Sequence, residues 1–206
     1  LRRQRQMCIR DRSSAGGVLA LNSYSNVIGS LSGSYGFVEN SGTNAVPAAA
    51  TLTIGGDNAN VTFGGVIRDG SAYALALTKN GTGVQTLSGS NLYTGNTTVN
   101  AGSLNITGTY VGSSTTSLLI YGNTSGKAVV NVAGDMALFA TQGANAFGAV
   151  AVYNQTAGNV ILGHNTSASN QFVANADGYG YFNLTGGLYQ FGAGGRFINV
   201  NGGGSY

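Results

Sequence analysis

The amino-acid sequence predicts an all-β solenoid, because short strand-like pieces alternate with polar turns along most of its 206 residues. The stretch Asn80–Ile106 shows this best: pieces such as Val84–Leu87 and Leu104–Ile106 are separated by clusters of Gly, Asn, Ser and Thr. Glycine accounts for 35 residues and proline for 1, which excludes a collagen-like or polyproline chain. The apolar fraction of 42% is patterned along the chain, which argues against disorder.

Charge is scarce and unevenly placed. Charged residues make up 7% of the chain, against about 25% in an ordinary globular domain. The segment Leu1–Arg12 holds five arginines and one aspartate, whereas the rest of the chain has four basic and five acidic residues. The net charge of +3 therefore comes from one end, so it predicts no nucleic-acid partner. Cys8 is the only cysteine, which excludes disulfides and cysteine-based metal sites from the body.

We expect three regions along the chain. Leu1–Arg12 resembles a translated sequencing-adapter sequence, so we predict that residues 1–12 are a disordered artefact outside the fold. No apolar segment of signal-peptide length follows this basic run. Residues 13–50 are expected to form irregular coils or a loop, and residues 51–206 a series of stacked coils. The sequence ends without a polar cap, and we expect the solenoid to be incomplete at both ends.

The strand pattern is clear just before the central stretch. Leu52–Ile54 and Val61–Phe63 alternate apolar and polar residues, and Gly55–Asn58 between them is a strong turn signal. Ala72–Thr78 alternates over a longer run and leads into Asn80–Gly81. An Asn-Gly pair supplies the positive φ of a tight corner, so we expect one there.

The later half contains a looser internal repeat. Tyr153–Leu162 and Phe182–Phe191 align at a constant offset, and both read aromatic-Asn-x-Thr-small-Gly before a final apolar residue. A similar piece begins at Phe197. Ala133–Val152 is rich in alanine, but its interposed glycines weaken a helix, so we expect a loop or a wide coil.

An ordered series of residues in the central stretch carries a family resemblance. The matching residues are Gly81, Gly83, Thr86, Leu87, Ser88, Gly89, Asn91, Tyr93, Thr94, Gly95, Thr97, Thr98, Val99, Ala101, Gly102 and Leu104. They follow the repeating core of the autotransporter-associated β-strand repeat, and the segment that resembles this family, Thr51–Ile106, covers about a quarter of the chain. The resemblance implies a right-handed parallel β-helix in the passenger region of a large secreted or surface-attached bacterial protein.

Such a helix stacks each strand in parallel on the equivalent strand of the next coil, about 4.8 Å away. We expect coils of about 20–25 residues. Inward Leu, Ile, Val and Phe would form columns along the axis, and outward Thr, Ser and Asn would stay solvated. Leu87 is expected to point inward. Asparagines at equivalent corners are expected to form amide ladders between coils.

The acidic residues of the body do not predict a catalytic pair. A glycosidase needs two carboxylates that converge on one groove. We interpret the isolated aspartates as turn-forming residues in Gly- or Asn-rich contexts: Asp57, Asp69, Asp135 and Asp177.

Other candidate sites are weaker still. His164 is the sole histidine and has no second histidine or nearby cysteine with which to bind a metal. The loop Gly122–Lys127 is one residue too short for a phosphate-binding loop, and Ala128 follows where Ser or Thr is required. We therefore predict no catalytic residue, no cofactor and no metal site.

The residues and the resemblance together predict a structural β-helical stalk of an autotransporter-type protein, without catalysis. Two alternatives stay open: an adhesin whose outer face binds host or environmental glycans or other copies of itself, and a carbohydrate-active enzyme on the same fold. We expect the protein at the outer-membrane surface of a bacterium or outside the cell. A signal peptide and a membrane translocator or anchor are expected outside this segment, because none of it is long and apolar enough to span a membrane.

Overall fold

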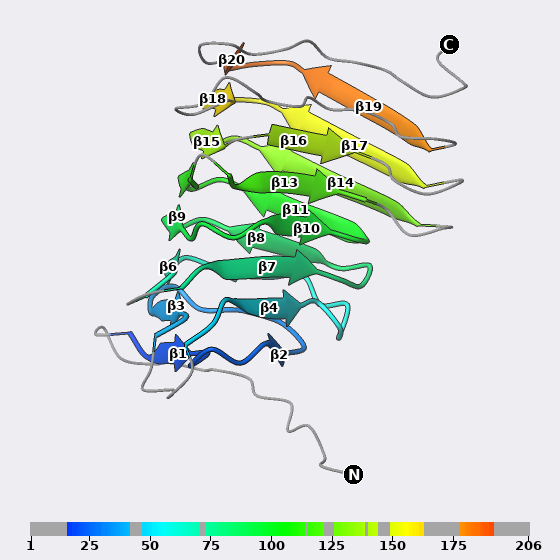
Figure 1. Ribbon diagram of the computed structural model, residues 1–206. Coiled ribbons are helices and arrows are strands. Elements are labelled where there is room, and N and C mark those ends of the chain that lie inside the picture. The colour runs from blue at the N-terminus through cyan, green and yellow to red at the C-terminus, as the bar shows by residue number, and fades with distance from the viewer. Residues whose placement is uncertain are drawn as a thin grey trace.

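The computed structural model describes residues 16–41, 47–70, 73–113, 115–121, 126–138, 140–143, 149–162 and 178–191. These residues form strands and turns without a helix, as the sequence predicted (Figure 1). The strands belong to three sheets, here called A, B and C, and every strand pair is parallel. The fold is a parallel β-helix.

The strands of the three sheets have the following bounds. Sheet A contains β1 (Val18–Ala20), β3 (Phe37–Glu39), β6 (Val66–Arg68), β9 (Asn91–Leu92), β12 (Tyr110–Val111), β15 (Met136–Leu138), β18 (Asn159–Leu162) and β20 (Leu188–Phe191). Sheet B contains β2 (Asn26–Val27), β4 (Ala50–Ile54), β7 (Leu75–Lys79), β10 (Thr97–Val99), β13 (Ser117–Ile120) and β16 (Ala140–Gly143). Sheet C contains β5 (Val61–Phe63), β8 (Val84–Leu87), β11 (Gly102–Ile106), β14 (Lys127–Val132), β17 (Val150–Gln155) and β19 (Tyr179–Leu184).

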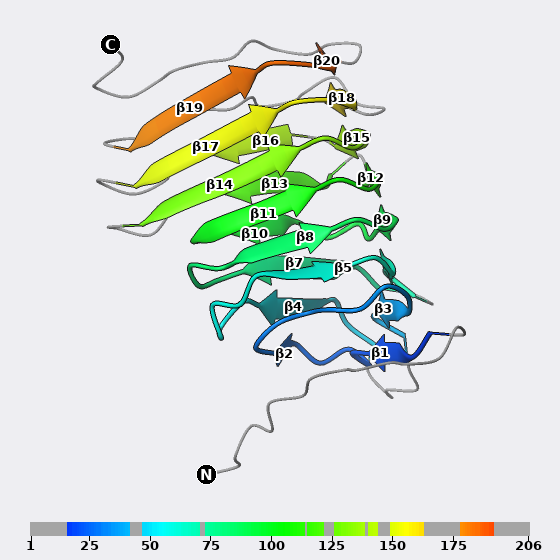
Figure 2. The same cartoon turned by 180° about the vertical axis from the view of Figure 1, so that it is seen from behind.

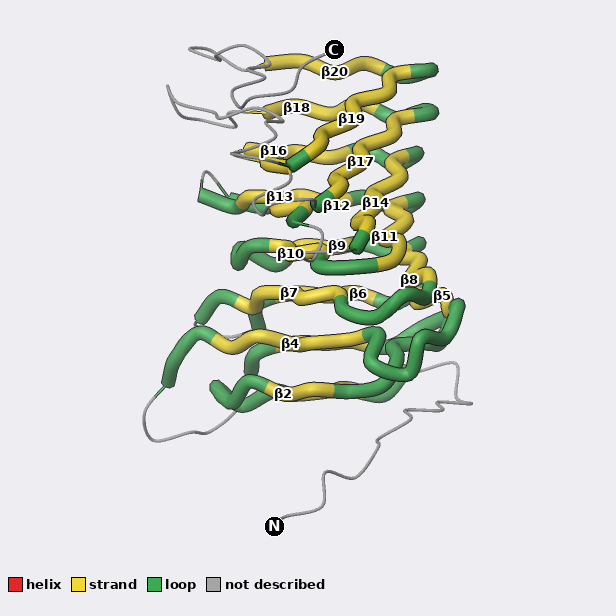
Figure 3. The backbone as a smooth tube through the Cα atoms, turned by 90° about the vertical axis from the view of Figure 1, so that its right-hand side faces the viewer, coloured by secondary structure: helices red, strands yellow, loops and turns green. Residues whose placement is uncertain are grey.

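One coil runs from sheet B through sheet C to sheet A, as in β7, β8 and β9, and the next coil repeats this order one layer higher (Figures 1 and 2). Figure 3 shows the layers from the side, with sheet B strands and sheet C strands in separate stacks. Equivalent asparagines of neighbouring coils are 20 residues apart at Asn80 and Asn100 and 29 apart at Asn154 and Asn183. The predicted coil length therefore holds in the middle of the chain, and longer coils of 29 residues occur both on the C-terminal side and, between Phe37 and Val66, near the N-terminal side.

The core lies between the three sheets and is built by strict alternation along the strands. In β11, Leu104 and Ile106 are buried, whereas Asn105 between them is half-buried on the outer face. Leu87 pairs with Ile106 and is 1% exposed, which confirms its predicted inward position. The period of two, together with a fixed register, places apolar side chains of successive coils in continuous columns.

Close stacking at the corners requires glycine at particular positions. Gly81 has φ of 69°, and a Cβ there would come 2.0 Å from the carbonyl oxygen of Gly55 in the coil below. This confirms the positive-φ corner predicted at Asn80–Gly81. A Cβ on Gly134 would come 1.8 Å from the carbonyl oxygen of Gly108, so only glycine allows the two coils to approach this closely.

Two segments that the sequence left irregular contain regular strands. Within residues 13–50, the structure contains β1, β2 and β3 and the first residue of β4. Within Ala133–Val152, it contains β15, β16 and the beginning of β17, so this stretch is a coil rather than a loop. Strands β15 and β17 pair with both neighbouring coils, whereas β16 pairs with β13 in the coil before it. Of the glycines that weakened a helix there, Gly143 is the last residue of β16. Gly134, in the same stretch, allows the close approach of two coils. Phe139 and residues 144–148 lie outside the described residues.

The internal repeat of the later half is confirmed by the strand register. Tyr153 pairs with Phe182, and Leu162 pairs with Phe191. The aromatic rings of Tyr153 and Phe182 stack with their centroids 4.9 Å apart. The piece predicted to begin at Phe197 lies outside the described residues.

Candidate functional site

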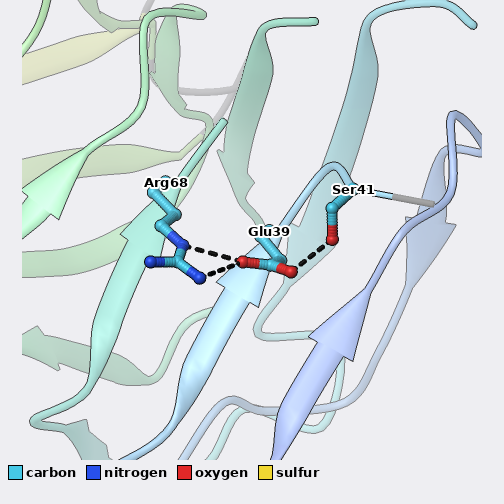
Figure 4. Close-up of polar contacts among 3 residues, drawn as sticks. All are labelled: Glu39, Ser41 and Arg68. Carbon is cyan, nitrogen blue, oxygen red and sulfur yellow. Dashed lines mark hydrogen bonds and ion pairs between the residues drawn. The ribbon is translucent and has the colours of Figure 1, made fainter. Parts of the chain in front are cut away.

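Glu39 is held in an ion pair on the outer face of sheet A (Figure 4). Its Oε2 accepts hydrogen bonds from Arg68 Nη2 at 2.6 Å and Arg68 Nε at 2.7 Å, and its Oε1 accepts one from the Ser41 hydroxyl. The Ser41 hydrogen bond and the Arg68 guanidinium lower the pKa of this carboxyl. Arg68 also lies 4.4 Å from the centre of the Phe37 ring. The sequence analysis missed this pair, because its members are adjacent only through the coil register.

The three aspartates in the described part of the chain accept hydrogen bonds from backbone amides, and two of them also join coils. Asp57 accepts a hydrogen bond from the Ala59 amide in its own turn at 3.1 Å. Asp69 accepts from the Leu75 amide at 2.8 Å, and from the amide and hydroxyl of Thr94 at 2.9 and 2.6 Å. Asp135 accepts a hydrogen bond at 2.8 Å from the amide of Asn159, one coil further on.

Metal ligands do not gather anywhere in the described part of the chain, which has no group of three or more His, Cys, Asp or Glu side chains. His164, Asp177 and Cys8 lie outside the described residues, as does most of the loop Gly122–Lys127. The structure therefore gives no position for these predicted candidates.

Lys79 is fully buried at the corner between sheets B and C, where it replaces the isoleucine and valine of neighbouring coils. Its ammonium donates to the carbonyl oxygens of Asn80 at 2.6 Å, Gly81 at 3.0 Å and Ala101 at 3.4 Å. Burial lowers the pKa of this amine, and the charge of Asp57 opposes that shift. The lysine thus stabilises two successive corners from within the core, a role that its alternating strand pattern alone did not reveal.

A second polar cluster in the core connects the loop after β9 with β10 and β12. The hydroxyl oxygen of Thr97 lies 2.5 Å from that of Tyr93 and 2.7 Å from that of Tyr110. All three residues are buried, and the two tyrosine rings lie 4.8 Å apart. Burial raises the pKa of Tyr93 to about 12 and also raises that of Tyr110. These hydroxyls satisfy one another inside the helix, so the cluster is structural.

The outer face of sheet C carries an asparagine ladder. Asn183 donates to Asn154 at 2.7 Å, Asn154 donates to Asn131 at 2.8 Å, and Asn131 donates to Asn105 at 2.7 Å. Each bond runs from the side-chain Nδ2 of one coil to the Oδ1 of the coil before it. The predicted amide ladder therefore exists on strands, and a shorter version joins Asn100 to Asn80 at 2.8 Å at a corner.

A groove lies beside the end of this ladder, over β14, β17 and β19. The described residues that line it are Lys127, Val150, Val152, Tyr179, Tyr181 and Asn183. Its volume is about 460 Å³, within the range of roughly 300–1,000 Å³ that is usual for small-molecule sites. Tyr179 and Tyr181 are 53% and 54% exposed. We call this feature the tyrosine groove; the strands that form it stand in front in Figure 2.

The described residues form no helix that is long and apolar enough to cross a bilayer.

Comparison with known families gives one match. Residues 77–106 match the family model described as passenger-associated-transport-repeat. The match confirms the resemblance found in the sequence and points to the passenger region of an autotransporter. It spans the end of β7 through β11, at the centre of the stack. Neither the curated proteins nor the solved structures gave a match.

Proposed function

We propose that this segment is a non-catalytic stalk within an autotransporter passenger, exposed at the bacterial surface. The observation that carries the proposal is the place of the matched repeat, residues 77–106, in the middle of a continuous parallel stack. The repeat contains most of one coil (β7, β8 and β9, here called the matched coil) and the strands β10 and β11 that stack on it. A stack of this kind gains its stability from contacts between neighbouring coils and needs no distant part of the chain. It therefore supplies length and stiffness to whatever the passenger displays.

The side chains of the matched repeat support this structural role. Lys79, Thr94 and Thr97 all form contacts that hold corners or successive coils together. The carboxylates that we could place, such as Asp69 and Glu39, are each engaged by neighbouring donors of the fold. The polar groups of the repeat thus contribute to its assembly, which supports a scaffold rather than an enzyme.

The repeat's resemblance to passenger repeats also suggests that coil formation outside the cell assists export. The test fuses the chain to a signal peptide and an outer-membrane translocator, and measures surface display from the protease accessibility of an N-terminal tag. Leu87→Asp disrupts the matched coil, so we expect display to fall several-fold. Leu184→Asp is the matched control, because Leu184 occupies the same column of sheet C but is 48% exposed. Equal display of the wild type and Leu87→Asp would contradict the proposed role.

A further inference from the structure

The outer face of sheet C changes in chemistry along the stack. In β8 and β11 the outward residues are Val84, Thr86, Ser103 and Asn105, which are small or polar. The row that begins at Val84 continues through Val129 and Val152 and ends at Tyr181. The neighbouring row runs from Lys127 through Val150 to Tyr179. The two exposed aromatic side chains on this face therefore stand together on β19, above a floor of valines.

The two tyrosines present a platform with an apolar base and a polar rim. Tyr179 and Tyr181 are two residues apart on one strand, so they project from the same face roughly 7 Å apart. Each exposes an aromatic ring that can cover apolar C–H groups, and each carries a phenol that can donate or accept a hydrogen bond. A ligand that suits the platform must combine an apolar face with many hydroxyl groups.

Asn183 completes the polar side of the groove. Its Nδ2 is used by Asn154 in the ladder, and all the ladder bonds run in the same direction. Among the described residues, the amide oxygen of Asn183 is therefore the last acceptor of the ladder. Lys127, at the opposite end of the groove, is exposed and adds an ammonium donor. The described lining contains no carboxylate, so the groove has the groups for binding but not the paired acids of glycoside hydrolysis.

We infer that the tyrosine groove binds a short oligosaccharide, with a pyranose face against Tyr181 and Tyr179 and hydroxyls bonded to Asn183 and Lys127. The volume of about 460 Å³ admits a few sugar rings. The exposed tyrosine rings and the hydrogen-bonding groups of the described lining match the apolar faces and hydroxyls of a sugar, which favours a glycan over a second copy of the chain. The inference goes beyond the stalk role and does not depend on it.

The test is a glycan array with neutral and acidic oligosaccharides, followed by calorimetric titration of the intact chain with the best neutral and the best uronic-acid ligand. We expect Tyr181→Ala to weaken binding at least tenfold. Tyr24→Ala is the matched control, because Tyr24 is 62% exposed near β2 at the other end of the stack. Lys127→Gln should weaken binding of the uronic acid more than that of the neutral sugar. Circular dichroism melts of all three variants verify that the fold is intact.

Three results would overturn the inference. The first is the absence of saturable binding to any sugar on the array by the wild-type chain. The second is an equal loss of affinity in Tyr24→Ala and Tyr181→Ala. The third is concentration-dependent self-association in analytical ultracentrifugation that Tyr181→Ala abolishes, which would assign the groove to a second copy of the chain. Because none of these readouts involves display at the cell surface, the stalk proposal stands or falls separately.

Discussion

The matched coil, formed by β7, β8 and β9, and the last described coil, which contains β19 and β20 and is here called the terminal coil, use the same register but bury their side chains differently. Leu87 in the matched coil is 1% exposed, whereas Leu184, in the same column, is 48% exposed. On the outer face, the row position of Val84 in β8 is taken by Tyr181 in β19. The inner-face difference follows from position in the stack, because in the described part of the chain β19 has a strand on one side only, whereas β8 lies between β5 and β11. The outer-face difference follows from the local sequence, which places tyrosine where β8 has valine.

The difference also separates two kinds of polar contact. In the matched repeat, Lys79 of β7 and Thr97 of β10 point into the core and are satisfied there by carbonyls and hydroxyls. In the terminal coil, Asn183 and Tyr181 face outward and leave polar atoms accessible. Buried polar groups specify one register, because any slip leaves them unpaired, whereas outward groups can serve recognition.

The largest predicted difference between the two coils follows from a charge in the shared column. Leu87→Asp places a carboxylate in the core, and we expect it to reduce the free energy of unfolding by about 4 kcal/mol or more. Leu184→Asp should cost less than about 1 kcal/mol, because its side chain remains in contact with water. Urea denaturation of both variants measures the contrast. Similar losses would show that the two positions do not differ in burial.

The hydroxyl cluster gives the second prediction. Thr97→Val removes the hydroxyl that pairs with both Tyr93 and Tyr110. Because two buried phenols lose this hydrogen-bond partner, the free energy of unfolding should fall by about 2 kcal/mol. Thr98→Val is the control, because Thr98 faces outward in the same strand. Thermal unfolding followed by circular dichroism compares the two. If both valine variants melt together, the cluster contributes nothing specific.

The raised pKa of Tyr93 makes stability depend on pH. The folded phenol keeps its proton up to about pH 12, whereas the unfolded phenol loses its proton near pH 10. The contribution of this group to the free energy of unfolding is therefore fully present below pH 10 and is lost as the pH rises toward 12. At pH 11 the loss from this one group is about 1.4 kcal/mol. Lys79 acts in the opposite direction, because its pKa is lowered and the fold gains stability as pH rises toward 10.5. Comparing Tyr93→Phe with the wild type at pH 9 and 11 isolates the tyrosine: the variant should lose less stability, and parallel losses would refute the assignment.

The asparagine ladder gives the smallest expected effect. Asn131→Ala breaks two amide bonds in the middle of the ladder, at a cost of about 1 kcal/mol, whereas Asn183→Ala breaks one exposed bond and should cost roughly half as much. Chemical denaturation resolves the two values. A larger loss in Asn183→Ala would mean that the ladder's outer end, rather than its middle, holds the coils together.

Much of the fold was predictable because it depends on local periodicity. The alternation of apolar and polar residues predicted the inward position of Leu87, and the Asn-Gly pair predicted the corner at Gly81. The aligned repeats predicted the pairing of Tyr153 with Phe182. The individual strands of Ala133–Val152, a stretch expected to form a loop or a wide coil, were not located from the sequence. The need for glycine at Gly134, for example, becomes evident only when Gly108 lies directly below it.

The candidate site was less predictable. The tyrosine groove combines Lys127, Val150 and Tyr179, which are separated by whole coils and meet only through the register. Which tyrosines stand together could not be worked out from the sequence, since coil lengths vary along the chain. Glu39 and Arg68 were missed for the same reason.

The central claim is that this chain stacks in parallel with one fixed register, and paired cysteines test it most directly. In a Cys8→Ser background, Asn105→Cys and Asn131→Cys place two thiols on directly paired outward positions, about 4.8 Å apart between Cα atoms. Asn105→Cys with Val129→Cys is displaced by two residues, which puts the Cα atoms beyond about 7 Å and outside disulfide reach. We expect mild oxidation of the monomer to cross-link the first pair nearly completely and the second pair hardly at all, as measured by mass spectrometry. Equal cross-linking of the two pairs, or a preference for the second, would contradict the stack described here.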